Sequence, residues 1–167
     1  MIGYFHCTSD TASAAGFRSI MGDIASYTPD WRLAGCHRFY LRDDVLFWEC
    51  HGPTNLQDVV VLLDMRTALL RRYGHVFLLV DAHDHGGIPA ESRRYAAKFR
   101  SDRPSPGVVV VFGAGLVVRT AVSLIISAAK LFHRDNSREL FFADNQAEAW
   151  AIVEQQRLVQ GTGQSPG

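Results

Sequence analysis

The fold is decided by the stretch Val76-Phe77-Leu78-Leu79-Val80-Asp81-Ala82-His83-Asp84-His85-Gly86-Gly87-Ile88-Pro89, in which an unbroken apolar run leads into a polar cluster. The five apolar residues from Val76 to Val80 predict a strand that is buried on both faces, as in a parallel sheet. Two glycines and a proline then predict the end of this strand and the start of a helix. Because ligands of open α/β sheets bind beyond the carboxyl ends of the strands, the sequence predicts a site here.

Predicted helices and strands alternate on both sides of this stretch. The polar turn Arg42-Asp43-Asp44 predicts a β-hairpin formed by residues 36–42 and 45–51. A helix is expected from Thr54, whose spacing to Gln57 fits a capping box, to Tyr73-Gly74. The later expectations are a helix at 89–100, a strand at 108–112, a helix at 116–133, a short strand near 140–142 and a last helix capped by Asp144. The order predicts an α/β fold in which a β-hairpin precedes alternating helices and strands, with a mostly parallel central sheet covered by helices.

The 167 residues suit one α/β domain, expected over residues 31–158. Residues 1–30 are rich in small residues and are expected to form an accessory N-terminal segment. Residues 159–167 are expected to be a disordered tail, because Gly, Ser, Gln and Pro dominate its end.

Composition argues against several classes of function. Lys plus Arg and Asp plus Glu both number 17, so no net charge draws the chain to nucleic acid. Three cysteines without CxxC spacing and an N-terminus without a signal-peptide pattern predict a cytoplasmic protein with reduced thiols. The apolar run 108–129 approaches the length of a membrane span, but glycines and Arg119 interrupt it, so no span is expected.

The polar cluster Asp81, His83, Asp84 and His85 contains side chains that zinc accepts as ligands. No HExxH motif or second matched cluster completes a metal shell, so we expect a solvated polar loop and neither a metal nor a cofactor. The alternative is a metal-dependent hydrolase in which Asp81, His83 and His85 hold an ion that acidifies a bound water. Asp81 alone is expected to cap the following turn or to position a partner.

The next strand-to-helix turn contains Gly113-Ala114-Gly115, and its helix carries Arg119. A helix start after glycines suits phosphate, but the complete phosphate-binding fingerprints are absent and a tight turn explains the glycines. The polar stripe of this helix is narrow. Its wide apolar surface predicts deep burial or contact with a partner, a second copy or an apolar ligand.

Two further patterns bear on function. No GxSxG elbow is present, and Cys50 and His51 are neighbours in a strand, so their side chains should point to opposite faces. We therefore expect no catalytic residue. The basic segment that contains Arg93, Arg94 and Lys98 is explained by a solvated face, and a docking surface for an acidic partner is the alternative.

An ordered set of short motifs covers about three quarters of the chain. These motifs are Gly35-Cys36-His37-Arg38, Tyr73-Gly74 before Leu78-Leu79-Val80-Asp81, Gly87-Ile88-Pro89-Ala90-Glu91-Ser92-Arg93-Arg94, Gly113-Ala114-Gly115 with Arg119, Leu131-Phe132, and Phe141-Phe142-Ala143-Asp144 before Glu148-Ala149-Trp150. With this set the chain resembles the SpoIIAA-like small bacterial α/β domains of the STAS and SEC14 type.

The resemblance implies a non-enzymatic domain, either a regulatory protein-binding module or a carrier of apolar ligands. Anti-sigma-factor antagonists of this type carry a phosphorylated serine in an Asp-Ser-Ser-Gly-like turn. This chain has Asp81-Ala82-His83-Asp84-His85 there, so no phosphorylated residue is implied. The preferred prediction is a regulatory or protein-interaction module, with a homodimer through the apolar helix as one form. A carrier of a small apolar ligand, held between the 116–133 helix and the sheet, is the alternative. The expected partner- or ligand-binding residues are Asp81, His83, His85, Gly113, Gly115 and Arg119.

Overall fold

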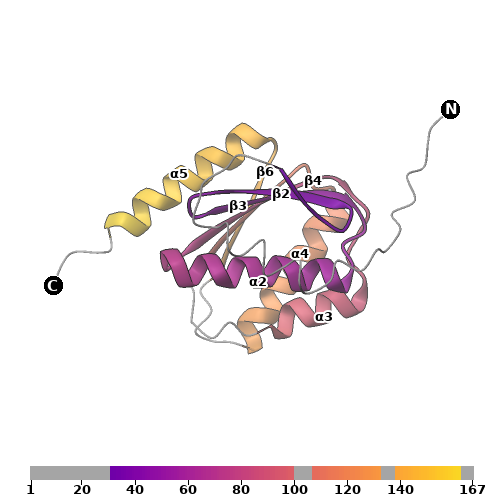
Figure 1. Ribbon diagram of the computed structural model, residues 1–167. Helices are drawn as coiled ribbons and strands as arrows, with labels where there is room; N and C mark the ends of the chain where they lie inside the picture. The colour runs from indigo at the N-terminus through magenta and orange to yellow at the C-terminus, as the bar shows by residue number, and fades with distance from the viewer. Residues whose placement is uncertain (1–30, 100–106, 133–137, 163–167) are drawn as a thin grey trace.

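A computed structural model describes residues 31–99, 107–132 and 138–162, so the expectations for residues 1–30 and 163–167 lie outside the described residues. The strands are β1 (Arg32–Ala34), β2 (His37–Arg42), β3 (Val45–Gly52), β4 (Val76–His85), β5 (Gly107–Phe112) and β6 (Arg138–Ala143). The helices are α2 (Leu56–Tyr73), α3 (Ala90–Lys98), α4 (Leu116–Phe132) and α5 (Gln146–Thr162). The α/β fold predicted from the sequence is confirmed (Figure 1).

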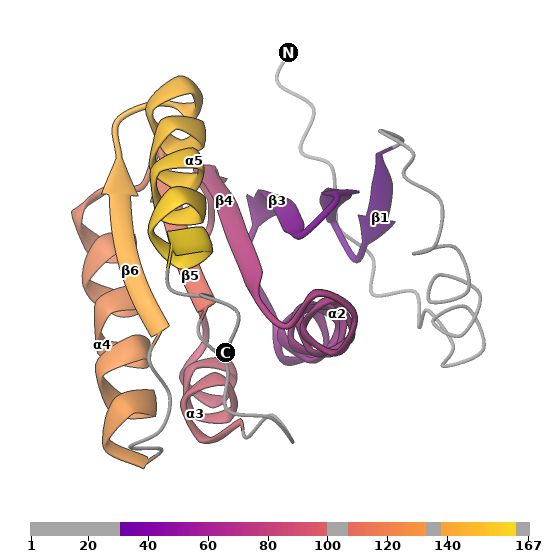
Figure 2. The ribbon, with the colours of Figure 1, turned by 90° about the vertical axis from the view of Figure 1, so that its left-hand side faces the viewer.

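The strands form one mixed sheet in sequence order from β1 to β6. Strands β1, β2 and β3 pair antiparallel, and β3, β4, β5 and β6 pair parallel. Figure 1 shows α5 above the sheet and α2, α3 and α4 below it, and Figure 2 shows α5 alongside β5 and β6. This layering follows from the topology, because parallel neighbours joined by crossovers of one hand place the connecting helices on the same face.

The two faces of the sheet have separate cores. On the α5 face, Phe47, Phe77 and Phe112 pack with aliphatic strand residues and with Ala149 and Val153 of α5. On the opposite face, Phe39, Trp48, Leu78 and neighbouring strand residues pack against α2 and α4. Both cores draw alternate residues from the same strands, as the period of a strand requires.

An ion-pair cluster around Asp44, in the turn after β2, joins α5 to the sheet. Asp44 accepts hydrogen bonds from the guanidinium of Arg157 in α5 and lies 2.7 Å from Nε2 of His75. Burial by itself raises the pKa of Asp44, but the hydrogen bonds and charges of Arg157 and His75 outweigh it and lower the pKa. The cluster therefore ties the last helix to the opening hairpin.

Several predicted element ends are wrong by a few residues. Helix α2 is capped by Asn55 and Asp58 in a reciprocal capping box, not by Thr54 and Gln57. The Asn145 side chain, not that of Asp144, accepts from the Glu148 amide at the start of α5. Strand β1 was not predicted at all. Helix α5 continues to Thr162, four residues into the expected tail.

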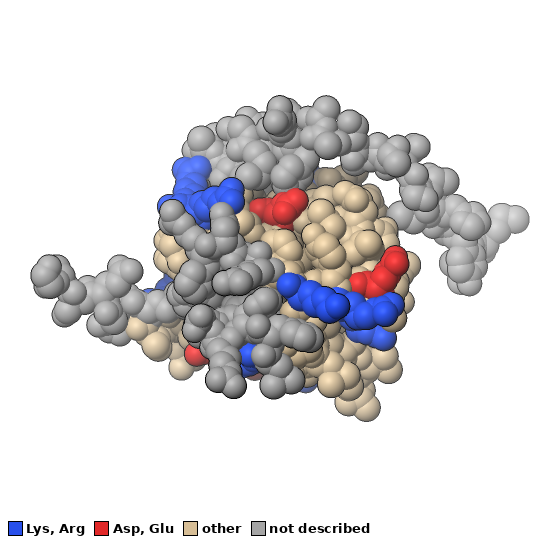
Figure 3. Space-filling model, turned by 90° about the horizontal axis from the view of Figure 1, so that it is seen from below, with Lys and Arg blue, Asp and Glu red and all other residues tan. Residues whose placement is uncertain are grey.

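The helices of the described part lack the combined length and apolar character that a bilayer crossing requires. Figure 3 views the molecule from the side of α2, α3 and α4, where Lys and Arg side chains lie in separate groups with acidic side chains among them. In the part of this face that the described residues form, basic and acidic side chains therefore lie near one another.

Candidate functional site

The polar cluster after Val80 lies within a strand, which corrects the expectation of a loop. Strand β4 continues to His85 because β3 is long enough to pair with it there, with His51 opposite Asp84 and Gly52 opposite His85. The register shifts between Glu49 and His51, where β4 contains one extra residue. Such a bulge reverses which residues face each side of the sheet, so the side chains before and after it diverge.

Asp81 and His83 lie together on the α5 side of the sheet. Oδ1 of Asp81 is 2.7 Å from Nδ1 of His83 and accepts the backbone N–H of His83 at 3.1 Å. The His83 ring meets Phe112 edge to face and lies over Gly113, whose φ of 69° places it in the left-handed region. The His83 side chain is 62% exposed, so this pair borders solvent and not a cavity.

His85 lies on the opposite side of the sheet, among the apolar residues that face α2 and α4. Its Nδ1 accepts the backbone N–H of Gly87 at 2.9 Å, and its Nε2 is 3.1 Å from Oγ1 of Thr54. Because Nδ1 accepts a backbone donor, Nε2 carries the proton and donates it to Thr54. Burial and the neighbouring His37 lower the pKa of His85, which favours this neutral form.

A close backbone approach fixes the chain at this point. The Gly86 N–H donates to the carbonyl of Gly52 at 2.8 Å, and the Thr54 N–H donates to the carbonyl of Gly87 at 3.0 Å. A Cβ atom at Gly86 would lie 2.6 Å from the nitrogen of Pro53, so only glycine fits there without a shift of the backbone. These contacts hold His85 in place at the carboxyl end of the sheet.

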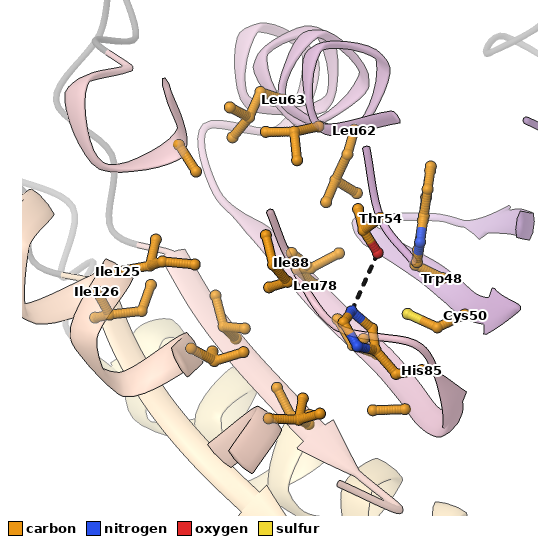
Figure 4. A pocket seen from close by; sticks show the side chains of 18 of the residues that line it. Trp48, Cys50, Thr54, Leu62, Leu63, Leu78, His85, Ile88, Ile125 and Ile126 are labelled. Atoms are coloured by element: carbon orange, nitrogen blue, oxygen red, sulfur yellow. Dashed lines mark hydrogen bonds between the residues drawn. The ribbon is translucent and has the colours of Figure 1, made fainter. Parts of the chain in front are cut away.

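An inner cavity of about 130 Å³ lies between the sheet and the helices α2, α3 and α4 (Figure 4). Figure 4 shows Leu62 and Leu63 of α2 on one side of it, Ile125 and Ile126 of α4 on another, and the hydrogen-bonded pair Thr54 and His85 at its edge. The remaining lining is supplied mainly by aliphatic residues of β4, β5 and α4. The lining also includes Trp48, Cys50 and Arg66.

A wider outer pocket of about 340 Å³ adjoins the inner cavity. Its walls come from the Pro53 and Gly86–Pro89 segments, from Arg93 of α3 and from the first turns of α4. His85, Ile88 and Val118 line both spaces and therefore stand between them. The site thus has an apolar interior and a more polar vestibule at the end of β4.

Three of the six predicted site residues, Asp81, His83 and Gly113, lie together, but the six do not form one site. Of them, only His85 lines the two pockets. Arg119 donates from Nε to the Ala114 carbonyl at 3.0 Å, lies over the ring of Phe142 and is 3.6 Å from Asp144, instead of reaching the segment after Asp81. Among the described residues, no group of three or more His, Cys, Asp and Glu side chains is arranged to hold a metal ion.

The sequence did not reveal a buried pair formed by His37 and Asp58. Nε2 of His37 is 3.3 Å from Oδ2 of Asp58, and both side chains are nearly inaccessible. Cys36 lies 4.0 Å from the same Nε2, which gives the trio the composition of a Cys–His–Asp triad. However, Nδ1 of His37 accepts the His51 amide at 3.0 Å, so Nε2 is the protonated nitrogen and donates to Asp58. His37 therefore has no lone pair with which to deprotonate Cys36, and the trio is structural.

The other cysteine near the site is equally unsuited to nucleophilic chemistry. Cys50 lines the inner cavity on the face opposite His51, as predicted. Burial, followed by the charge of Asp81, raises the pKa of its thiol to about 12. At neutral pH the Cys50 thiol is therefore protonated, and it contributes a weakly polar surface to the cavity lining.

Comparison with known proteins does not assign the chain to a family: no family model matches it, and no curated protein matches it. The SpoIIAA-like resemblance therefore stays a prediction from the sequence motifs.

Proposed function

We propose that this protein is a non-catalytic binding protein that holds a small apolar molecule in the inner cavity. The observation that carries the proposal is a space of about 130 Å³ between the sheet and its helices, with an almost wholly apolar lining that extends to the carboxyl ends of β4 and β5. Apolar cavities of similar size stay dry and bind benzene-sized molecules. The resemblance to SpoIIAA-like domains, which include carriers of apolar ligands, points the same way.

The polar groups of the cavity support holding a ligand more than transforming it. Thr54 and His85 satisfy each other by a hydrogen bond, and the second nitrogen of His85 is engaged by the Gly87 amide. The Cys50 thiol is protonated because burial raises its pKa. A general base needs a free basic nitrogen or carboxylate and a thiol nucleophile needs to be ionised, whereas both nitrogens of His85 are engaged and the Cys50 thiol is protonated.

Thermal unfolding in the presence of toluene tests this function. The wild-type Tm is expected to rise with toluene concentration, because a ligand that binds only the folded state stabilises it. Val122→Phe places a ring in the cavity and should abolish the response. Leu124→Phe changes the exposed side of the same helix and should keep it. A wild-type Tm that toluene leaves unchanged, in a protein with a cooperative transition, would contradict the proposal.

A regulatory role through protein contact is the second candidate, and the surface of α4 favours it. Leu116, Val117 and Leu124 are 81%, 80% and 64% exposed, so one helix presents three large apolar side chains to solvent. Such patches mark interaction surfaces, and a second copy of this chain is the simplest occupant. Sedimentation equilibrium is expected to show a dimer that Leu124→Glu dissociates; a wild-type monomer at all concentrations would contradict the homodimer.

A further inference from the structure

Among the described residues, the Lys, Arg, Asp and Glu side chains that line the two pockets are all arginines. Arg66 lines the inner cavity and Arg93 lines the outer pocket, and no Asp or Glu belongs to either lining as the structure describes it. Arg66 is 2% exposed and its guanidinium lies against Gly107, at the amino end of β5 and away from His85. Arg93 is exposed at the vestibule. The exposed guanidinium of Arg93 therefore makes the vestibule favourable for a negative charge.

Arg93 has unused hydrogen-bonding capacity. Its Nη1 donates to the carbonyl of Ile88 at 2.9 Å, which holds the guanidinium beside the outer pocket. Within the described residues no carboxylate lies within ion-pair distance of it. A guanidinium has five N–H donors in a planar fork, so the remaining donors can bind an anion in a bidentate manner.

The shape of the site separates the two ends of a ligand. The inner cavity suits an apolar body of about the size of a benzene ring. A charged group would lose its hydration among those side chains, whereas in the outer pocket it keeps contact with water and faces Arg93. A phosphate monoester carries nearly two charges near neutral pH, and the outer pocket lining supplies one arginine, so a singly charged carboxylate is the better match.

We propose that the ligand is a small monocarboxylate whose apolar body lies in the inner cavity and whose carboxylate pairs with Arg93 in the outer pocket. This inference rests on the proposed function, since it names the chemical class of the molecule that the cavity holds. It also gives Arg93 a specific role in selecting the ligand. The ring or short chain supplies the buried apolar contact, and the carboxylate fixes its orientation.

Calorimetric titration with phenylacetate and 2-phenylethanol tests the inference, because the two probes share an aryl body and differ in the headgroup. Wild-type protein is expected to bind phenylacetate about tenfold more tightly, as a charge-assisted hydrogen bond contributes more than a neutral one. Arg93→Gln should remove this preference and leave the affinity for 2-phenylethanol unchanged. Arg94→Gln, which changes the neighbouring arginine outside both linings, should keep the preference.

The outcomes separate the two proposals. If both probes bind equally, or if Arg93→Gln retains the preference, the carboxylate assignment is wrong while the cavity remains a binding site. If Arg66→Gln alone removes the preference, the carboxylate lies in the inner cavity and the assignment to Arg93 is again wrong. If neither probe nor toluene binds, the proposed function itself fails. Circular dichroism of each variant confirms that it is folded before titration.

Discussion

The two faces of the central sheet are built from the same strands, but the described residues cover them differently: one carries a core of aromatic and aliphatic side chains, which we call the filled face, and the other borders the inner cavity, which we call the hollow face. On the α5 face, Phe47, Phe77 and Phe112 and their aliphatic neighbours meet a single helix, and the ion pairs of Asp44 fasten that helix in place. On the opposite face, three helices share the surface, and the inner cavity lies beneath them. The difference shows that covering a sheet with more helices does not by itself fill the space next to it.

The position of α3 explains the hollow. This short helix packs against α4 and α2 in preference to the sheet, so it closes the layer from outside and leaves a space over β4 and β5. Aliphatic side chains line that space, and polar groups are confined mainly to one edge. The filled face is therefore in contact with α5, whereas the hollow face leaves space between the sheet and its helices.

The largest effect expected concerns access to Cys50 on the hollow face. A thiol with a pKa of about 12, compared with an ordinary value of about 9, has roughly a thousandfold less thiolate at pH 8. Alkylation by iodoacetamide, followed at the Cys50 peptide by mass spectrometry, should be slower in the native protein by at least that factor than in urea. Native labelling at the unfolded rate would show that this face is open to solvent and not enclosed.

The next effect concerns the ion pairs of Asp44 that hold α5 on the filled face. Asp44→Asn should lower the free energy of unfolding by about 2 kcal/mol at pH 7, because hydrogen bonds to a charged group are lost. The pKa of Asp44 is lowered in the folded state, so its contribution is present above the unfolded pKa and is lost as pH falls through the folded pKa. Urea unfolding should thus show the difference from wild type at pH 5–7 and its disappearance in acid. A difference that persists unchanged below pH 2 would contradict this origin.

Two neighbouring valines in β5, Val109 and Val110, allow a matched comparison of packing on the hollow face and on the filled face. Val110→Ile adds a methylene to the filled face and should cost about 1–2 kcal/mol through overpacking. Val109→Ile adds the same group toward the inner cavity and should be neutral or stabilising by about 0.5 kcal/mol. Chemical denaturation measures both. Equal losses in the two variants would mean that the faces do not differ in packing.

A last effect, similar in size to that of Val110→Ile, concerns the edge where Asp81 and His83 meet the turn after β5. Gly113→Ala should destabilise the fold by about 1–2 kcal/mol, because its φ of 69° disfavours a side chain and a Cβ would meet the His83 ring. Gly115→Ala is the control, since its Cβ would meet open space, and it should change stability by less than about 0.5 kcal/mol. Similar melting temperatures for the two variants would contradict the packing of His83 on Gly113.

Most helices and strands of the fold could be predicted from short local patterns in the sequence. The hairpin turn at Asp43 and Asp44 and the end of α2 at Gly74 were predicted because a few adjacent residues determine them. The predicted N-terminal caps of α2 and α5 were each one residue away from the observed caps. Several polar residues stand near each helix start, and the direction in which the chain enters the helix decides which of them caps it. Strand β1 lacked a signal of its own, because its three residues are stabilised by pairing with β2.

The candidate site was predicted in part. Its general place at the end of β4 followed from the sequence, and so did the apolar space between α4 and the sheet that the ligand-carrier hypothesis required. Thr54 was expected only as a helix cap and Arg93 only as part of a basic surface segment, and the α2 lining was not expected, because these residues reach the site only through the packing of three helices. The buried pair of His37 and Asp58 was also missed, since 21 positions separate its members and no local pattern links them.

What the sequence determined by itself was the order of elements and the alternation of faces within each strand, as in the opposite orientation of Cys50 and His51. Both properties depend on neighbours along the chain, and backbone geometry fixes them. Only the tertiary structure decided that His83 faces solvent while His85 enters the cavity wall, because one extra residue in β4 reverses the alternation between them. It also decided that α3 stands away from the sheet, which leaves the space that we propose holds the ligand.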